Sequence, residues 1–292
     1  MRHSPYSVKV ELVRGCNRRC PFCSINTMAW KDDPYKFMNS NIFAAVIDEL
    51  AVWRPKGRLE LDERGEPTYH PDFFNLIRYA RNHLPETQIT VITNGDLASK
   101  VEDFPAWLNE AFEAGLNIAV LDCYTQKRYE QFNELFADGK DFYRDGFNPY
   151  HYHGSKNRIA LVVDCTPVQG VTGRSVRYLT NQAGNVNMEL AAKGGYPFDG
   201  SPRQVSMCSR PFHDMALHCN DEGEITVPFC CNDWSDEIVI GQFPSYSLQE
   251  IWWFMDDFRR QMIEQGRQTI PLCAKCSYPQ FRAHLEKRWF DA

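Results

Sequence analysis

The sequence predicts an α/β fold, with an incomplete (β/α) barrel followed by a smaller C-terminal unit. Through about residue 165, segments with strand character alternate with segments with helical character. Strands separated by helices form parallel sheets with right-handed crossovers. Beyond about residue 170 the pattern changes, because Gly, Asn and Pro interrupt the chain, cysteines recur and the expected strands are short.

The predicted strands of the barrel are 7–13, 58–61, 88–93, 116–121 and 159–163. The predicted helices are 40–53, 71–82, 104–114 and 125–136. Polar and apolar residues alternate in the first strand, which indicates a half-buried strand. Ser40 can cap the first helix. In parallel α/β sheets the active site lies at the carboxyl ends of the strands.

In the C-terminal unit we expect short strands at 224–227 and 238–240. One long helix, SLQEIWWFMDDFRRQMIEQG, is predicted from Ser247 to Gly266. The predicted division is a barrel at 1–170, a connector at 171–200 and a C-terminal domain at 201–292.

Composition narrows the function classes. Hydrophobic residues make up 43% and charged residues 24% of the 292 residues, as in globular proteins. The net charge of −6 argues against general nucleic-acid binding. We find no signal peptide and no apolar run near the ~18 residues of a membrane span, so we expect a cytoplasmic protein. Eleven cysteines in such a chain favour metal binding or catalysis over disulfides.

Cys16, Cys20 and Cys23 lie in the run CNRRCPFC, directly after the first predicted strand. Three thiolates so close in sequence can hold one soft metal centre. A structural zinc normally takes four protein ligands, and the next cysteine is Cys123. On a cubane cluster, three protein ligands leave one iron open for a substrate or cofactor. A zinc site completed by a distant His, or cysteines that are merely buried, is the alternative.

The spacing C-x3-C-x-aromatic-C after a strand resembles the radical S-adenosylmethionine (SAM) superfamily. Gly65-Glu66-Pro67-Thr68 follows the second strand and resembles the Gly-Glu-Pro segment of that family. Arg64 stands where the family often has a second glycine. The resemblance implies that Gly65, Glu66 and Pro67 meet the amino group of SAM.

The resemblance implies further SAM contacts. The backbone of Phe22 is expected near the adenine and Asp122, at the end of the fourth strand, near the ribose. Asn94 closes the third strand within Thr93-Asn94-Gly95, as is common in the family. An arginine is wanted for the SAM carboxylate, and the candidates are Arg158, Arg174 and Arg177.

A second group of cysteines crowds the last third of the chain: Cys208, Cys219, Cys230, Cys231, Cys273 and Cys276. Their order, with a Gly-containing hairpin, a helix and a final Cys-x2-Cys pair, resembles the SPASM and twitch auxiliary-cluster domains. The resemblance implies that Cys208, Cys230, Cys273 and Cys276 bind a second [4Fe–4S] cluster. Six residues separate Gly223 from Cys230 where the family has four, so Cys231 stays an alternative to Cys230. A zinc ribbon is the alternative for the whole site.

The resemblance implies an enzyme with SAM and two [4Fe–4S] clusters, reduced by a flavodoxin or ferredoxin. Cleavage of SAM would give a 5′-deoxyadenosyl radical that takes hydrogen from a substrate carbon. We expect oxidation of a small polar metabolite, and no membrane or nucleic-acid partner. The alternatives are modification of a peptide, or redox-neutral epimerisation with a thiol hydrogen donor from Cys123, Cys165, Cys219 or Cys231. An iron–sulfur electron carrier or a zinc-binding module is the non-enzymatic alternative.

Overall fold

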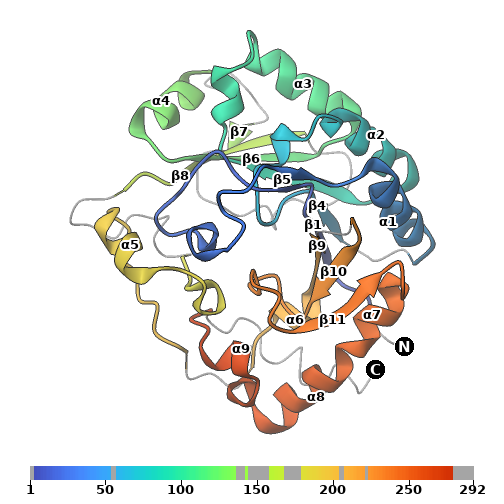
Figure 1. Ribbon diagram of the computed structural model, residues 1–292. Helices are drawn as coiled ribbons and strands as arrows, with labels where there is room; N and C mark the ends of the chain where they lie inside the picture. Colours follow the sequence, from blue (N-terminus) through green and yellow to red (C-terminus); the bar gives the residue numbers. More distant parts are fainter. Residues whose placement is uncertain are drawn as a thin grey trace.

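The computed structural model describes residues 3–53, 57–135, 142–143, 158–167, 179–203, 207–220 and 223–278. One nine-stranded sheet organises these residues (Figure 1). Its strands are β1 (Ser7–Val10), β4 (Arg58–Glu60), β5 (Gln88–Thr93), β6 (Ile118–Cys123), β7 (Phe142–Tyr143), β8 (Ile159–Asp164), β9 (Asp214–Cys219), β10 (Ile225–Pro228) and β11 (Val239–Phe243). The predicted α/β class is confirmed.

The strand order is β11-β10-β9-β1-β4-β5-β6-β8-β7. Neighbouring strands from β9 to β7 are parallel, whereas β10 is antiparallel to both β9 and β11. Within the described residues β11 and β7 remain the two edges, so the sheet does not close into a barrel there. A separate hairpin consists of β2 (Val13–Arg14) and β3 (Lys36–Phe37).

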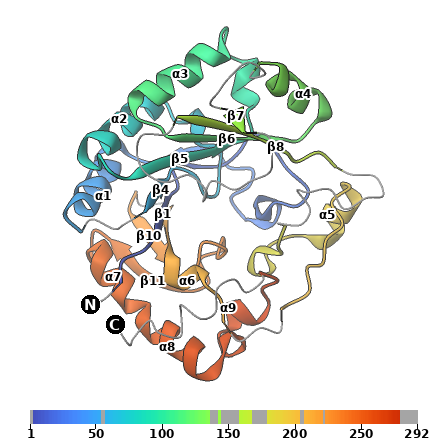
Figure 2. The same cartoon turned by 180° about the vertical axis from the view of Figure 1, so that it is seen from behind.

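Helices α1 (Ser40–Trp53), α2 (Phe73–His83), α3 (Phe104–Ala114) and α4 (Gln126–Leu135) cover the outer face of the curved sheet (Figures 1 and 2). These are the four predicted barrel helices: α1 and α3 have the predicted bounds, and the ends of α2 and α4 differ by one or two residues. The later helices are α5 (Met188–Lys193), α6 (Arg210–His213), α7 (Leu248–Phe254), α8 (Asp256–Gln265) and α9 (Pro271–Ala274). Short 3₁₀ turns are η1 (Ser24–Thr27), η2 (Pro67–Tyr69), η3 (Asp96–Ser99), η6 (Gln182–Gly184) and η7 (Arg267–Thr269).

The prediction of one continuous helix from Ser247 to Gly266 is wrong. It is divided at Met255 into α7 and α8. The buried side chain of Arg259 explains the break, because its Nη1 donates a hydrogen bond to the carbonyl of Trp252 at 2.7 Å. That carbonyl would otherwise accept from the backbone N–H of Asp256 in a continuous helix.

The expectation of a half-buried first strand is also wrong, because all residues of β1 are buried. The strand lies between β4 and β9. Its polar side chains are buried in pairs: Lys9 forms an ion pair with Glu60, and Ser7 Oγ donates to Glu60 Oε1 at 2.6 Å. The alternation of polar and apolar residues in β1 therefore reflects two buried faces of the sheet, one polar and one apolar.

Strand β9 was absent from the predicted elements, although it pairs with β1 in parallel from Ser7↔Asp214 to Val10↔Leu217. The C-terminal part of the chain therefore extends the same sheet as the barrel strands. The division at 170 and 200 stays a prediction, since part of the expected connector, 171–178, lies outside the described residues.

Buried charges fasten the start of the chain to its C-terminal part. Arg64, 2% exposed, donates through Nε and Nη2 to the two carboxylate oxygens of Glu11, each at 2.9 Å. Its Nη1 donates to Asp236 Oδ2 at 2.8 Å and to the Trp234 carbonyl at 3.0 Å. Arg64, the departure from the family pattern, is thus the link between the Gly-Glu-Pro loop and the segment after β10.

Among the described residues, no helix has both the length and the apolar character that crossing a bilayer requires.

We expect Arg64→Met to lower the free energy of unfolding of the metal-free protein by about 3 kcal/mol or more, because it leaves the buried Glu11 carboxylate without its cation. Arg64→Met combined with Glu11→Gln should recover much of this loss. Arg78→Met, which breaks the exposed pair with Glu110, is the matched control and should cost less than about 1 kcal/mol. Urea unfolding measures all three; equal losses for Arg64→Met and Arg78→Met would contradict the assignment.

Candidate active site

The three cysteines of the CNRRCPFC run lie in the loop beyond the carboxyl end of β1. Cys16 Sγ accepts hydrogen bonds from the backbone N–H of Arg18 at 3.4 Å and from Asn94 Nδ2 at 3.6 Å. Burial raises the pKa of Cys20, and so do the neighbouring Cys23 and Cys16. Burial likewise raises the pKa of Cys23 to about 12, with a further contribution from Cys16. The fold therefore brings the three thiols together, and a bound metal would be needed to hold them as thiolates.

Polar contacts hold this loop against the carboxyl end of β5. Arg18 forms a bidentate pair with Asp96, with Nε–Oδ2 at 2.7 Å and Nη2–Oδ1 at 2.6 Å. Asn17 donates to Asp96 at 2.9 Å and accepts from Asn94 at 2.8 Å. Because a bidentate guanidinium–carboxylate pair fixes direction as well as distance, the loop has a defined orientation.

The Gly-Glu-Pro segment meets the cysteine loop directly. Gly65 bridges to Gly15, and a Cβ at Gly65 would lie 1.9 Å from the Val13 carbonyl oxygen, so only glycine fits. The Glu66 carboxylate accepts from Thr68 Oγ1 at 2.6 Å, Thr93 Oγ1 at 2.6 Å and the Asn94 N–H at 2.9 Å. With Glu66 only 2% exposed, these bonds lock the segment to the end of β5.

Asp122 ends β6 on the same edge, where burial raises the pKa of its carboxyl group to about 7. It accepts a hydrogen bond from Tyr124 Oη at 3.2 Å. The ring of Phe22 lies 5.9 Å from that of Tyr124 and 4.6 Å from that of Tyr196. Sequence reasoning missed both tyrosines, because only the tertiary fold places them beside Phe22.

Within the described residues, the geometry does not identify the arginine predicted for the SAM carboxylate. Arg158 precedes β8 and therefore lies at its amino end, opposite to the edge that carries the cysteine loop. Arg174 and Arg177 lie outside the described residues.

The second group of cysteines comes together from three separate segments. All of its members are buried, and Cys208 and Cys276 both contribute to raising the pKa of Cys273, after burial itself. The pKa of Cys230 is raised by Cys231, by burial and by Cys208. Cys208, Cys230, Cys273 and Cys276 are thus neighbours. The thiol of Cys231 lies beside that of Cys230 and has two further contacts: it accepts from Arg210 Nη1 at 3.3 Å and lies 3.9 Å from Asp214 Oδ2.

Hydrogen-bond donors around these four cysteines fit an iron–sulfur cluster. The backbone N–H groups of Asn232 and Tyr278 donate to the sulfurs of Cys230 and Cys276, each at 3.4 Å. In the described part of the chain, Asn232 Nδ2 and Arg267 Nε are buried without an acceptor. Buried donors are normally paired, and the sulfur atoms of a cluster accept such bonds.

No group of three or more His, Cys, Asp or Glu side chains is arranged around a single metal ion within the described residues. In a cubane cluster each thiolate binds a different iron, so its ligands lie farther apart than those of one zinc ion. The arrangement of both cysteine groups is therefore compatible with clusters.

The remaining cysteines occupy different surroundings. Cys123 is the last residue of β6, and its fully buried side chain lies in the large core cluster on the helix-covered side of the sheet, away from the inner face. Cys165 packs with Ile118, Val120, Leu161 and Val163 on the opposite, inner face.

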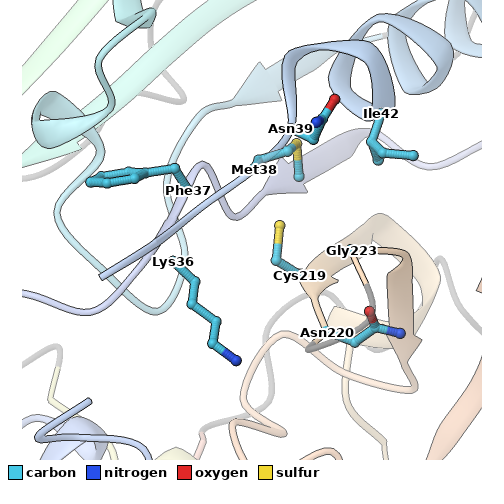
Figure 3. A pocket seen from close by; sticks show the side chains of 8 residues that line it. All are labelled: Lys36, Phe37, Met38, Asn39, Ile42, Cys219, Asn220 and Gly223. Carbon is cyan, nitrogen blue, oxygen red and sulfur yellow. The ribbon is translucent and has the colours of Figure 1, made fainter. Parts of the chain in front are cut away.

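Cys219, the last residue of β9, lines a cavity of about 290 Å³. The other lining residues are Lys36, Phe37, Met38, Asn39, Ile42, Asn220 and Gly223. Figure 3 shows the side chains of Cys219 and Met38 pointing toward one another across it. This cavity includes none of the residues predicted to bind SAM or a cluster.

The comparisons with known proteins agree with this geometry. Residues 10–125 match the model of the radical SAM superfamily. The matched segment contains the first three cysteines, Gly65-Glu66-Pro67 and Asp122. No curated protein matches the chain.

Two solved structures of BtrN are similar to nearly the whole chain. A structure of BtrN in complex with AdoMet and 2-DOIA has a TM-score of 0.66 and 17% identity, and the match covers 95% of each chain. BtrN in an open conformation has a TM-score of 0.60 and 15% identity, covering 95% of this chain and 94% of the other. These likenesses show that the fold is shared over nearly the whole chain.

We expect the raised pKa of Asp122 to make stability depend on pH. Between the ordinary carboxyl value of 3.8 and about 7, the folded protein holds a proton that the unfolded chain has released. Stability should therefore fall as pH rises through this window, and Asp122→Asn should fall less steeply. Urea unfolding of both proteins between pH 4 and pH 7.5 measures the slopes. Equal slopes would show that Asp122 is ionised in the folded state throughout.

Proposed function

We propose that this chain is a radical SAM enzyme that oxidises a small polar metabolite. The observation that carries the proposal is the meeting of Cys16, Cys20 and Cys23 with the Gly65-Glu66-Pro67 segment at the carboxyl ends of β1, β4 and β5. When bound, a reduced [4Fe–4S] cluster and SAM supply a 5′-deoxyadenosyl radical that takes hydrogen from carbon. The protein supplies binding, orientation and exclusion of water.

The described residues divide the binding of SAM among them. The Glu66 carboxylate is engaged by Thr68, Thr93 and Asn94, so it positions the segment, whose backbone carbonyls would meet an ammonium group. Phe22, with the flanking Tyr124 and Tyr196, offers an aromatic surface beside the loop for an adenine ring. Asp122 offers an acceptor for ribose hydroxyl groups.

We expect Glu66→Ala to weaken SAM binding by about tenfold or more, because two threonine hydroxyls and one N–H lose a shared acceptor and the segment loosens. Iron content should stay unchanged. Glu113→Ala, at an exposed position of α3, is the control. Equilibrium binding of SAM to anaerobically reconstituted protein tests this, and an unchanged affinity would remove this segment from the SAM site.

We propose a second [4Fe–4S] cluster on Cys208, Cys230, Cys273 and Cys276. The buried N–H donors of Asn232 and Arg267 support this proposal. Cys231 is engaged by Arg210 and Asp214, which favours Cys230 as the ligand. Four protein thiolates would leave no open iron, so this centre would carry electrons.

Reconstituted protein should hold about eight irons, given the two cubane clusters proposed. We expect Cys230→Ser to lose about half of the iron and Cys231→Ser to keep it. Iron and sulfide analysis of each variant provides the answer. Loss of iron in Cys231→Ser alone would exchange the two roles, and zinc at this site would exclude the cluster.

Oxidation needs an electron acceptor near the substrate radical. Positive charge around a cluster makes the cluster easier to reduce and therefore a better acceptor. Arg267 is buried beside the proposed cluster, where its Nη2 donates to the Cys276 carbonyl at 2.7 Å. Burial raises the pKa of Cys208 and of Cys273, and the charge of Arg267 opposes that rise. A fixed positive charge stabilises the reduced, more negative form of a cluster.

We therefore expect Arg267→Met to lower the midpoint potential of this cluster by tens of millivolts, at about 59 mV per tenfold change for one electron. Arg267→Lys should restore most of the shift. Redox titration followed by electron paramagnetic resonance measures the potential. A potential that is the same in all three proteins would mean that Arg267 has no electrostatic effect on a cluster.

Epimerisation is the second candidate, and the placement of Cys165 favours it over other redox-neutral chemistry. Cys165 lies on the inner face of the sheet, and Asp122 makes the largest contribution after burial to raising the pKa of its thiol. A protonated thiol there could return a hydrogen atom to a substrate radical. If Cys165→Ser stops product formation but not 5′-deoxyadenosine formation, the reaction is epimerisation.

The partners follow from the same chemistry. The complex of BtrN with AdoMet and 2-DOIA supports SAM as the cofactor and a small molecule as the substrate. We propose a cytoplasmic enzyme, reduced by a flavodoxin or ferredoxin, with a peptide as the less favoured substrate.

A further inference from the structure

The inner face of the sheet is polar on one side and apolar on the other. The register places Lys9, Glu60 and Thr90 side by side on β1, β4 and β5, followed by Ile118 on β6. In the row nearer the carboxyl ends, Asp62 follows β4, and beside it Ile92 pairs with Val120 and Val120 with Leu161. These apolar residues form a cluster separate from the helix-covered core, so they line the face opposite to the helices.

Several polar atoms on this face have no hydrogen-bond partner in the described structure. Asp62 is 8% exposed, and its Oδ2 is unpaired. The same holds for the Oγ1 of Thr90, which is 1% exposed. Buried polar atoms are paired in folded proteins, so an unpaired set on one face indicates water or a ligand.

His218, on β9, adds a third unpaired atom. Its Nδ1 lies 2.6 Å from Asp236 Oδ1, whereas its Nε2 is unpaired and lies 3.7 Å from Glu63 Oε1. That distance is within ion-pair range but exceeds a hydrogen bond, so Nε2 keeps the capacity to bond a hydroxyl group.

The charges on the polar side select the class of ligand. Glu63 brings a carboxylate to this side, while Lys9 is already engaged in an ion pair with Glu60. An anion would meet the Glu63 carboxylate, whereas a hydroxyl or ammonium group can donate to an oxygen of Asp62. Burial raises the pKa of Asp62 to about 8, so the carboxyl can also donate to a hydroxyl oxygen. The apolar side, at Ile92 and Val120, suits the carbon face of a ring.

We propose that Asp62 is a substrate-binding residue that hydrogen-bonds a hydroxyl group of an uncharged or cationic polyhydroxylated ring. The proposal rests on the proposed function, since it places the substrate on the inner face below the SAM site. It assigns Thr90 and His218 as further hydroxyl partners, and it excludes carboxylate and phosphate substrates.

The test uses three probes with one ring and different charges: glucose, glucosamine and glucuronate. Saturation-transfer NMR on the reconstituted protein with SAM should detect glucose and glucosamine, with glucuronate weaker by about tenfold or more. Asp62→Leu should weaken the first two by about tenfold. Asp62→Asn, which keeps an acceptor oxygen and the side-chain shape, should retain them, as should the exposed control Asp199→Leu.

Glucuronate bound as well as glucose, no effect of Asp62→Leu in the folded protein, or no transfer from glucose and glucosamine to the wild type would overturn the proposal. If Asp62→Leu does not fold, loss of binding in Asp62→Asn would overturn it. The binding readout does not depend on SAM cleavage. Formation of 5′-deoxyadenosine by the reduced wild type is scored separately, so failure of the proposed function is distinguished from failure of this assignment.

Discussion

The buried carboxylate of Glu11 joins the three parts of the chain that build the site. It lies just beyond β1, accepts two bonds from Arg64 and accepts the backbone N–H of Cys219 at 2.8 Å. The end of β1, the Gly-Glu-Pro loop and β9 therefore share one buried anion. Because an uncompensated charge is costly in this interior, the three segments are stable only when they are together.

This constraint has a consequence for the two cysteine groups. The first group follows β1, and Glu11 fixes the end of that strand. The second lies in the segments around β9 and β10, which the same carboxylate and Arg64 hold to the barrel strands. A sheet that runs without interruption from β11 to β7 gives the two groups a fixed relation, as electron transfer between a substrate site and an auxiliary cluster would need.

Much of the barrel could be predicted because its signals are local. The four helices and the strands at 88–93 and 159–163 show in periodicity and turn residues, and the spacing of Cys16, Cys20 and Cys23 shows in the sequence itself. The pairing of β9 with β1 could not be predicted, since it joins residues some two hundred positions apart and the partner of His218 Nδ1, Asp236, meets it only in the fold. For the same reason the tyrosines beside Phe22 and the unpaired oxygen of Asp62 left no sequence signal.

The central claim is that Cys16, Cys20 and Cys23 hold a cluster with an open iron that SAM occupies. Electron paramagnetic resonance of the dithionite-reduced protein tests it most directly, in a variant whose Cys208, Cys230, Cys273 and Cys276 are replaced by Ala, so that only the first site can bind iron. The account predicts a [4Fe–4S] signal whose shape changes when SAM is added. A cluster signal that is identical with and without SAM would contradict it.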